Sequence, residues 1–568
     1  MRLVCLLLLA ACVRPDAKLP PPSEASRVDA ECEASELQRR PSAGVRALLD
    51  APVAATRARA ALAAGRIGDA QAIDRLAQLL LDAEAGETAA WALGRIDGGQ
   101  AALVRCLSQP CPSAAAAARA LAGPAAGKSP QTAALVAALS GPAADEAAFA
   151  LGILARNKEA KFPPRAWAAL AALLPRAGAA YALSRLPQGS AEAMRPALAA
   201  ALRAGDPWTR ALSARAWGRQ GLPAEGLAQA FDDADWRVRV EAARGLATAP
   251  GALALFAAVV PRQTSPHVLV ALFEAAAQLG KGALPALPLT SADFVVRCAA
   301  AQARDRIRGQ LIDTPLCEQR SPAPSKEVNG VYQPEWRSRA RTGALAAALG
   351  LVEPARAAMQ DPDARVRGAT AGAAGPAQAD DLRKLLADPD PYVVQEAKGA
   401  LARDPSAHFV QNVRMAPVPP EARAMPAARR LRLRTTRGEL VIDLRPDVAP
   451  LTASALAALA ARHFYDGLSF HRVVPDFVVQ GGDPRGDGDG GPAPGWALPD
   501  EHSPLRFLRG TLGIATDGPE TGGSQFFLCH SPQPHLDGRY TIAGQLAAGG
   551  DVLDALEPGD TILSAAAE

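Results

Sequence analysis

Aromatic residues are scarce in this chain of 568 residues, where Phe, Trp and Tyr together make up 4%. The chain also lacks an excess of charge of either sign, because 61 Lys and Arg residues and 58 Asp and Glu residues leave a net charge of +3. The chain has no long basic run, so we expect no nucleic-acid partner. Its 8 cysteines and 7 histidines show none of the spacings of a zinc site, and we predict no metal site.

The hydrophobic run at the N-terminus, MRLVCLLLLAAC, is too short to cross a membrane. It predicts a secretory signal over residues 1–11. The ending Leu9 to Cys12 resembles the lipoprotein box of bacteria, which implies cleavage before Cys12 and lipid attachment to that residue; an ordinary signal peptide with a chance cysteine is the alternative. We expect a lipid-anchored, extracytoplasmic protein, and Val13 favours the outer membrane, facing the periplasm.

Repeated segments fill the middle of the chain, which is rich in Ala, Leu and Arg and therefore favours helix. AALAAGRIGD from Ala60 returns as AAWALGRIDG from Ala89, and Asp-Pro-Asp or a close variant recurs before later helical segments, with aspartate expected as N-cap and proline in the first turn. The units resemble HEAT-like repeats, which implies an α-solenoid over residues 41–403. We predict an unidentified protein partner on its surface; a plain spacer is the alternative.

Flanking segments separate these repeats from the two ends of the chain. Residues 12–40 are predicted to be a polar tether, and the proline-rich residues 404–428 a stiff linker. The recurring arginines of GRIGD and RVRVEAARG indicate a solvated helix face, partners for neighbouring aspartates, or an anion-binding ridge. In an oxidising compartment, Cys106 with Cys111 and Cys298 with Cys317 are close enough in sequence to form disulfides.

Two motifs near the C-terminus carry the chemistry: FHRVVPDFVVQGGD from Phe470 and GGSQFFLC from Gly522. The first alternates with a period of two and predicts two short strands, broken at Pro475-Asp476. Such strands would bring Arg472, Phe477 and Gln480 to one surface, where donors beside an apolar wall suit a proline ring and its amide.

Both motifs resemble those of the cyclophilin family of peptidyl-prolyl isomerases, and the resemblance covers residues 429–568. The fold it implies is a closed, eight-stranded antiparallel β-barrel capped by two helices, so that the whole chain is multidomain, an all-α solenoid followed by a cyclophilin-like barrel. An opening hairpin that turns at Arg437-Gly438 and a first helix entered through Pro450 belong to this expectation. No cofactor is implied.

The resemblance also implies roles for single residues. Arg472 matches the family's catalytic arginine, and the groove is expected to bind proline-containing polypeptides. The implied proline pocket consists of Phe477, Gln480, Phe527 and Leu536, and the groove for the residue before proline contains Ala515 and Gln525. Val478, Thr516, His535 and Tyr540 also line the site but depart from eukaryotic members, which have methionine, asparagine, tryptophan and histidine there.

The sequence therefore predicts a peptidyl-prolyl cis-trans isomerase that acts on exported proteins and is positioned by a repeat scaffold on a membrane. The alternative is a non-catalytic scaffold that binds proline-containing peptides without turnover. Retention of Arg472, Phe477 and Gln480 together favours the enzyme.

Overall fold

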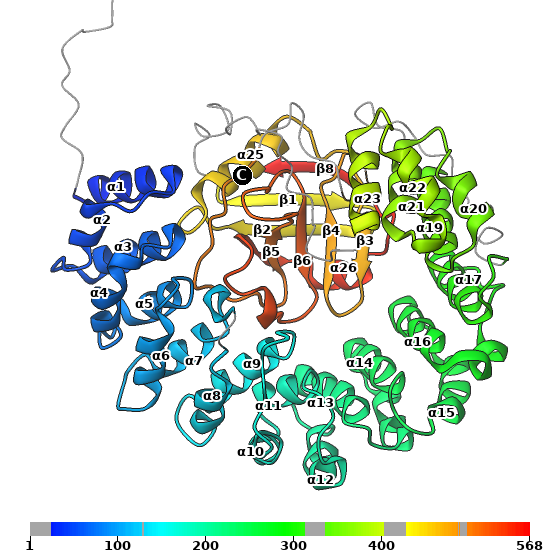
Figure 1. The fold of residues 1–568 in the computed structure, drawn as a ribbon, viewed down its shortest axis with the longest axis horizontal. Helices are drawn as coiled ribbons and strands as arrows, with labels where there is room; N and C mark the ends of the chain where they lie inside the picture. The colour runs from blue at the N-terminus through cyan, green and yellow to red at the C-terminus, as the bar shows by residue number, and fades with distance from the viewer. Residues whose placement is uncertain are drawn as a thin grey trace, which may run out of the picture.

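The computed structural model has two regions, a curved array of helices and a C-terminal sheet domain that lies inside the curve (Figure 1). It describes residues 24–127, 130–312, 335–402, 428–484, 486, 488 and 497–568. Cys12, Cys317 and nearly all of the predicted linker 404–428 lie outside these residues. The predicted tether 12–40 contains a helix, α1 (Glu24–Gln38), which packs on the next long helix instead of forming an extended segment.

The array consists of short α-helices with occasional 3₁₀ turns, in the order that the repeats predict. Its elements are α1 (Glu24–Gln38), α2 (Ala43–Leu48), α3 (Ala54–Ile67), η1 (Ala70–Ala72), α4 (Ile73–Leu79), α5 (Gly86–Leu93), α6 (Gln100–Leu107), α7 (Ala114–Ala120), η2 (Pro124–Ala126), α8 (Thr132–Ala138), α9 (Ala144–Leu154), α10 (Arg165–Leu173), α11 (Ala177–Leu183), α12 (Ala191–Ala201), α13 (Pro207–Arg219), η3 (Ala224–Asp232), α14 (Trp236–Leu246), α15 (Ala252–Val259), η4 (Val260–Arg262), α16 (Pro266–Leu279), η5 (Gly280–Ala286), α17 (Phe294–Arg308), α19 (Glu335–Ala348), α20 (Val352–Ala358), α21 (Ala364–Ala373), η6 (Pro376–Gln378), α22 (Ala379–Leu385) and α23 (Pro391–Ala402).

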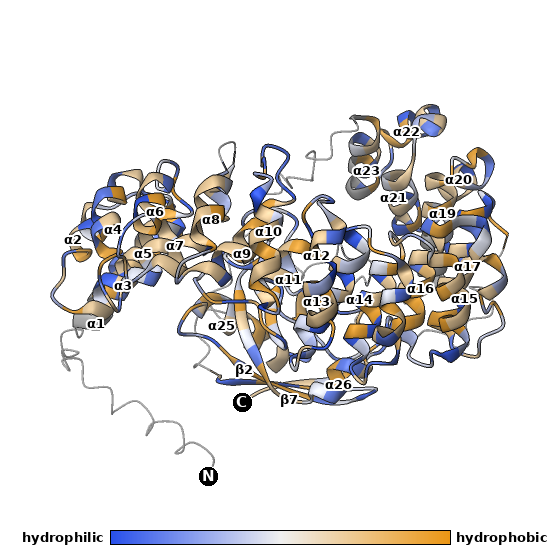
Figure 2. Ribbon diagram, turned by 90° about the horizontal axis from the view of Figure 1, so that it is seen from below, coloured by the Kyte–Doolittle hydropathy of each residue, from blue (hydrophilic) through white to orange (hydrophobic). Residues whose placement is uncertain are grey.

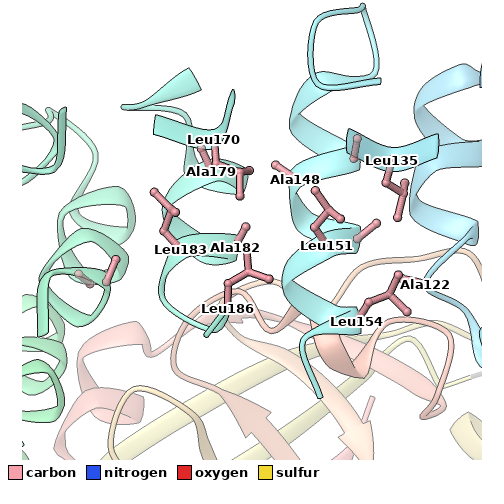
Figure 3. Packing of buried hydrophobic residues seen from close by; sticks show 14 of the residues in the cluster. Ala122, Leu135, Ala148, Leu151, Leu154, Leu170, Ala179, Ala182, Leu183 and Leu186 are labelled. Atoms are coloured by element: carbon pink, nitrogen blue, oxygen red, sulfur yellow. The ribbon is translucent and has the colours of Figure 1, made fainter. Parts of the chain in front are cut away.

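Small residues let the inner helices of the array approach closely. Helix α3 packs on α5, α5 on α7, α7 on α9, α9 on α11 and α11 on α13, and one apolar core runs from α1 to α17. A Cβ atom on Gly65 would lie 2.7 Å from the Trp91 ring and 2.8 Å from the backbone of Ala92, so only glycine fits there. Alanines and leucines such as Ala148, Leu151 and Leu183 fill the space between neighbouring helices (Figure 3).

Arginines near the starts of inner helices tie each repeat to the next. Arg210 donates to Asp233 through Nε and Nη2 at 2.7 and 2.9 Å, and its Nη1 donates to the Ala204 and Gly205 carbonyls before its own helix. Arg57 and Arg367 make equivalent contacts with Asp82 and Asp388. We call this series the arginine ladder. Its arginines partner neighbouring aspartates, but they are not those of GRIGD and RVRVEAARG, whose Arg66 and Arg237 contact the sheet domain.

The aspartates of the repeated motif have two different roles, N-capping a helix and binding an arginine, which the sequence pattern did not distinguish. Asp206 caps α13 with Pro207 in the first turn, as predicted. In the later units the third residue of the motif is the N-cap, as in Asp363 on α21, whereas Asp361 binds Arg339 at 2.8 Å. Pro362 therefore precedes the cap and does not lie in the first turn, which corrects the prediction for that unit.

The sheet domain is a strongly curled, eight-stranded antiparallel sheet. Its strands are β1 (Arg430–Thr435), β2 (Gly438–Leu444), β3 (Arg472–Val474), β4 (Val478–Gly481), β5 (Thr511–Ile514), β6 (Phe526–Cys529), β7 (Ile542–Ala548) and β8 (Ile562–Ala567), and its helical elements are α25 (Pro450–Ala461), η7 (Pro534–Leu536) and α26 (Gly550–Ala555). The β1–β2 hairpin turns at Thr436-Arg437, one residue before the predicted position.

Closure of the barrel is incomplete at the level of paired strands. The order is β3-β4-β6-β5-β7-β2-β1-β8, so β3 and β8 are the two ends of the sheet. The segments that precede these strands approach each other, with a bridge between Ser469 and Thr561 and a 2.8 Å hydrogen bond from Phe470 N to Asp560 O. The predicted closed barrel is thus observed as an open sheet whose ends are joined by a short bridge.

The array and the sheet domain are in direct contact. The prediction of a stiff linker at residues 404–428 did not anticipate this contact. Arg66 donates to His502 O at 2.8 Å and to Val448 O at 2.7 Å, and Arg95 contacts Gly538 O and His502 Nδ1. Figure 2 shows helices α9 to α14 running along the side of this domain. The array therefore packs against one side of the sheet domain.

A second group of contacts joins α14 and α16 to the domain. Arg237 donates to Asp554 at 2.9 Å and to His530 O at 3.2 Å, and His267 Nε2 lies 2.9 Å from Asp554 O. The Trp236 ring packs against both histidines, with centroids 4.8 Å from His267 and 5.2 Å from His530, and the two histidine rings are 5.7 Å apart. The interface thus combines charged contacts with a buried aromatic cluster.

Cys106 and Cys111 form a disulfide, as their spacing permits, and Cys529 is a buried strand residue. The predicted pair of Cys298 and Cys317 is not described, because Cys317 lies outside the described residues. The stretch Pro266–Ala286 is long and apolar enough to cross a membrane by length and composition. It comprises α16 and η5, and α16 packs between α14 and α17, so we interpret it as a core segment of the array.

Candidate active site

The β3–β4 hairpin presents the first group of site residues. Arg472 pairs with Gln480 across the two strands, and Gln480 pairs in turn with Phe527 on β6. Because side chains alternate along a strand, Val479 points into the main core while Val478 and Gln480 face away from it. Phe477 lies in the turn between the strands, where its N–H donates to Val474 O at 3.0 Å.

A row of polar side chains crosses this surface. Arg472 Nη1 donates to Gln480 Oε1 at 3.2 Å, and Gln480 Nε2 donates to Gln525 Oε1 at 3.0 Å. Gln525 is anchored by a bond from its Nε2 to Gly488 O at 2.6 Å. Each side chain therefore fixes the orientation of the next, and the guanidinium of Arg472 keeps further N–H groups for a ligand.

The floor beneath this row is an apolar cluster, separate from the main core of the sheet domain. Phe527 is its centre, 6% exposed, and its ring stacks on Phe507 with centroids 5.6 Å apart and meets Tyr540 edge-on at 5.8 Å. The remaining members are Val478, Cys529, Leu536 and Ile542, with Phe477, Leu505 and Ala515 packed against them.

Space for the Phe527 ring depends on one glycine. A Cβ atom on Gly513, which pairs with Phe527 across β5 and β6, would lie 2.6 Å from the Phe507 ring. A side chain there would displace both rings, so Gly513 is a structural part of the apolar floor. Neither Gly513 nor Phe507 was among the predicted site residues. The sequence feature that could have indicated them is their position, since Gly513 lies on strand β5 and Phe507 lies shortly before it.

Phe477 connects the arginine to the far rim of the site. Arg472 lies over the Phe477 ring, with its guanidinium carbon 5.8 Å from the ring centroid, and the other neighbour of this ring is His535, stacked at 5.5 Å with an interplanar angle of 24°. The order across the surface is therefore Gln525, Gln480, Arg472, Phe477 and His535.

Electrostatics keep the arginine charged and the histidine neutral. Burial lowers the pKa of Arg472 somewhat, and the nearby Tyr540 phenol acts in the opposite direction. Burial, followed by the charges of Arg185, Arg156 and other arginines, lowers the pKa of His535 to about 2. His535 therefore offers a neutral ring at physiological pH, where eukaryotic members have an indole.

All ten substrate-binding positions predicted from the sequence lie on or beside this surface together with Arg472. Ala515 is held by its N–H, which donates to Gln525 O at 3.0 Å, and Thr516 follows it, half-buried, in the loop after β5. His535 and Leu536 come from η7, and Tyr540 comes from the segment before β7.

Helix α14 of the array supports the turn that carries Phe477, and sequence reasoning missed this contact. Arg244 donates to Pro475 O at 2.7 Å, and the Asp476 carboxyl is buried beside Glu241. Asp476 has a φ of 54°, and its carbonyl accepts from Ser531 and Gln533, both at 3.0 Å. The left-handed turn is therefore fixed by groups from both regions.

Burial and the neighbouring carboxylate set the protonation of this pair. Burial, followed by the charge of Glu241, raises the pKa of Asp476 well above its usual range. Burial opposes ionisation of Glu241 too, but Arg244 and Arg215 outweigh it and lower the pKa of Glu241 to about 2. At neutral pH Asp476 is therefore the protonated partner and Glu241 the anion.

Known proteins match the last quarter of the chain. Residues 430–566 match the family model "Cyclophilin type peptidyl-prolyl cis-trans isomerase/CLD". A peptidyl-prolyl cis-trans isomerase of Synechococcus elongatus is 46% identical over 134 residues, which are 23% of this chain and 91% of the relative. Isomerase B of Bacillus subtilis is 43% identical over 124 residues, 22% of this chain and 87% of the relative.

A solved cyclophilin of Cryptosporidium parvum, crystallised in the presence of the dipeptide Ala-Pro, is 33% identical and covers 24% of this chain and 98% of its own, with a TM-score of 0.24.

A curled antiparallel sheet with a polar row above an apolar floor defines a half-barrel of the cyclophilin type. Through residues 430–566 the chain belongs to the family of cyclophilin-type peptidyl-prolyl cis-trans isomerases. It is accordingly an enzyme of that class, with a helical region of about 380 residues in front of it.

Proposed function

We propose that Arg472 is the catalytic residue and that the proline ring of the substrate sits on Phe527, Phe477 and Leu536. The observation that carries this proposal is the position of Arg472, which is bonded to Gln480 and lies at the edge of the apolar floor. Ala515 and Gln525, at the other end of the polar row, hold the residue before proline.

Rotation about an Xaa-Pro bond needs no bond to form or break, since its barrier of about 20 kcal/mol reflects partial double-bond character of the C–N bond. In the twisted state the prolyl nitrogen becomes pyramidal and gains a lone pair. Arg472 donates to that lone pair, which is absent in either planar isomer, so the contact stabilises the transition state more than the bound substrate. Gln480 and the Thr516 backbone hold the flanking chain.

The test is cis-to-trans isomerisation of a proline tetrapeptide by the full chain and by Arg472→Ala. We expect kcat/KM to fall by about 100- to 1000-fold, the size of effect seen when one positioned donor is removed from a transition state. Arg462→Ala, which removes an exposed arginine at the end of α25, is the matched control. A folded Arg472→Ala protein within about threefold of wild type would refute the assignment.

The alternative function, a scaffold that binds proline-containing peptides without turnover, has a different outcome in the same experiment. The wild-type chain would bind the tetrapeptide but would leave its isomerisation rate at the uncatalysed value.

We also propose that the array is a HEAT-like α-solenoid that holds the isomerase at a membrane and provides a surface for a protein partner. The arginine ladder supports the repeat assignment, because equivalent arginines at Arg57, Arg210 and Arg367 meet equivalent aspartates. The Cys106–Cys111 disulfide supports an oxidising, extracytoplasmic location. Exported proteins are then the substrates.

Lipid anchoring at Cys12 has its own test. In a bacterial host the wild-type chain should incorporate a fatty-acid label and sediment with membranes, whereas Cys12→Ser should do neither. Labelling of both chains, or of neither, would refute the anchor.

A further inference from the structure

The rim of the groove at His535 is built by both regions of the molecule. His535 and Leu536 belong to η7, and α9 of the array packs against this element. Leu154 ends α9 and Leu186 follows α11, and both are buried in the apolar core of the array (Figure 3). Arg156 comes two residues after Leu154, and Arg185 directly precedes Leu186. Both arginines lie near the His535 rim, because their charges act on its ring.

Arg185 occupies the same repeat position as the arginines that bind the domain elsewhere. Arg66 and Arg95 each follow a glycine at the end of an inner helix and donate to carbonyls of the sheet domain. Arg185 follows Ser184 at the end of α11, but among the described residues it makes no hydrogen bond or ion pair, and its buried Nε has no acceptor. Its guanidinium rests on the Tyr181 ring at 4.4 Å.

Positive charge is in excess around this rim. Arg185, Arg156, Arg539 and Arg215 all act on the ring of His535, with Arg185 the strongest of the four. Arg156 is exposed, and no ion pair to it occurs in the described residues. Arg539 donates to Ala122 O at 3.1 Å, which leaves its charge without a carboxylate.

The acidic groups nearby are already engaged. Glu241 binds Arg215 at 3.3 Å and also contacts Arg244. Asp537 accepts from Phe507 N at 2.8 Å, and burial raises its pKa to about 7, so its negative charge is reduced at neutral pH. An anionic group that enters the rim would therefore meet arginines without competing carboxylates.

We propose that Arg185 and Arg156 of the array are specificity-determining residues that select substrates with an acidic side chain after the proline. The proposal rests on the binding mode described above, in which Ala515 and Gln525 hold the residue before proline. His535 lies at the opposite end of the order across the surface, beyond Phe477, so the chain that leaves the proline passes the arginine rim. The preferred ligand is a Pro-Glu or Pro-Asp segment of an extended polypeptide.

The experiment compares the tetrapeptides Ala-Ala-Pro-Glu and Ala-Ala-Pro-Gln with the full chain, by dissociation constant and by kcat/KM. Glu and Gln have the same shape, so their ratio reports charge. We expect a preference for Glu of about three- to tenfold at low salt, the range of a partly exposed ion pair, and a smaller one at 0.5 M NaCl. Arg185→Gln should bring the ratio below about twofold, and Arg156→Gln, at an exposed site, should lower it in part.

Arg105→Gln is the matched control, because it removes one exposed arginine on α6, and it should leave the ratio at the wild-type value. A wild-type ratio near one in binding, or an equal ratio in wild type and both rim variants, would overturn the proposal. These outcomes are independent of the Arg472 assignment, which depends on turnover of the neutral peptide.

Discussion

Arginines at the two ends of the inner helices have different tasks. Those near the helix starts, Arg57, Arg210 and Arg367, bind aspartates and carbonyls of the array itself. Those near the helix ends, such as Arg66 and Arg95, cross to the sheet domain, where their acceptors include backbone carbonyls. The first set stabilises the array and the second fixes the position of the isomerase, so one abundant residue type provides both the scaffold and its docking.

The largest effect is expected where a docking arginine is buried. Arg244→Ala would leave Glu241 beside Asp476 with Arg215 as its remaining partner, 3.3 Å away. Breaking a buried pair costs about 3–5 kcal/mol, and because Arg215 remains we expect about 3 kcal/mol in the free energy of unfolding, measured by urea denaturation. The exposed pair of Arg262 and Asp232 is the control, where Arg262→Ala should cost less than about 1 kcal/mol. Equal costs for both variants would contradict the docking role.

A smaller effect is expected in the arginine ladder. Arg210→Ala removes two bonds to Asp233 and two to backbone carbonyls, all at a half-buried site. We expect a loss of about 1–3 kcal/mol in the stability of the array, seen as a lower denaturation midpoint, with unchanged isomerase activity. A loss of activity without a change in stability would show that the ladder acts on the catalytic domain after all.

The sequence predicts the groove better than the docking for a physical reason. Arg472, Phe477 and Gln480 lie within nine residues of one hairpin, so strand alternation alone places them on one surface. Arg66 and Arg95 are recognisable in the sequence as a repeated pair, but their acceptors are backbone carbonyls. Every residue has a backbone carbonyl, so the sequence does not indicate which ones accept these bonds. The contact of Glu241 with Asp476 joins segments far apart in the chain and could not be derived from local pattern.

The sequence pattern likewise did not predict how the two end strands of the sheet, β3 and β8, are paired. The family resemblance implies a closed barrel, yet β3 has only three residues and ends the sheet, while the contact with the β8 side is made by Ser469 and Phe470 before the strand begins. Period-two alternation locates strands but does not specify which neighbours complete the ladder.

A pH-dependent effect is expected from the protonated carboxyl of Asp476 at the docking site. Burial and the charge of Glu241 raise the pKa of Asp476, so the folded protein retains a proton that the unfolded chain releases above the ordinary pKa of 3.8. Wild-type stability from this group therefore falls as pH rises from about 4 through the folded-state pKa. Asp476→Asn has no such proton, so its free energy of unfolding relative to that of wild type should rise between pH 4 and pH 7.

Thermal unfolding of both chains at the two pH values provides the measurement, and other titrating groups cancel in the difference. The same difference at pH 4 and pH 7 would show that Asp476 is ionised in the folded protein.

The claim that the helix-end arginines dock the isomerase on the array is tested most directly by small-angle X-ray scattering of the full chain. The comparison is with a triple variant, Arg66→Ala, Arg95→Ala and Arg244→Ala. We expect a compact wild-type profile that matches the docked arrangement and a larger radius of gyration for the variant. A wild-type profile as extended as that of the variant would contradict docking and would make the array a tether.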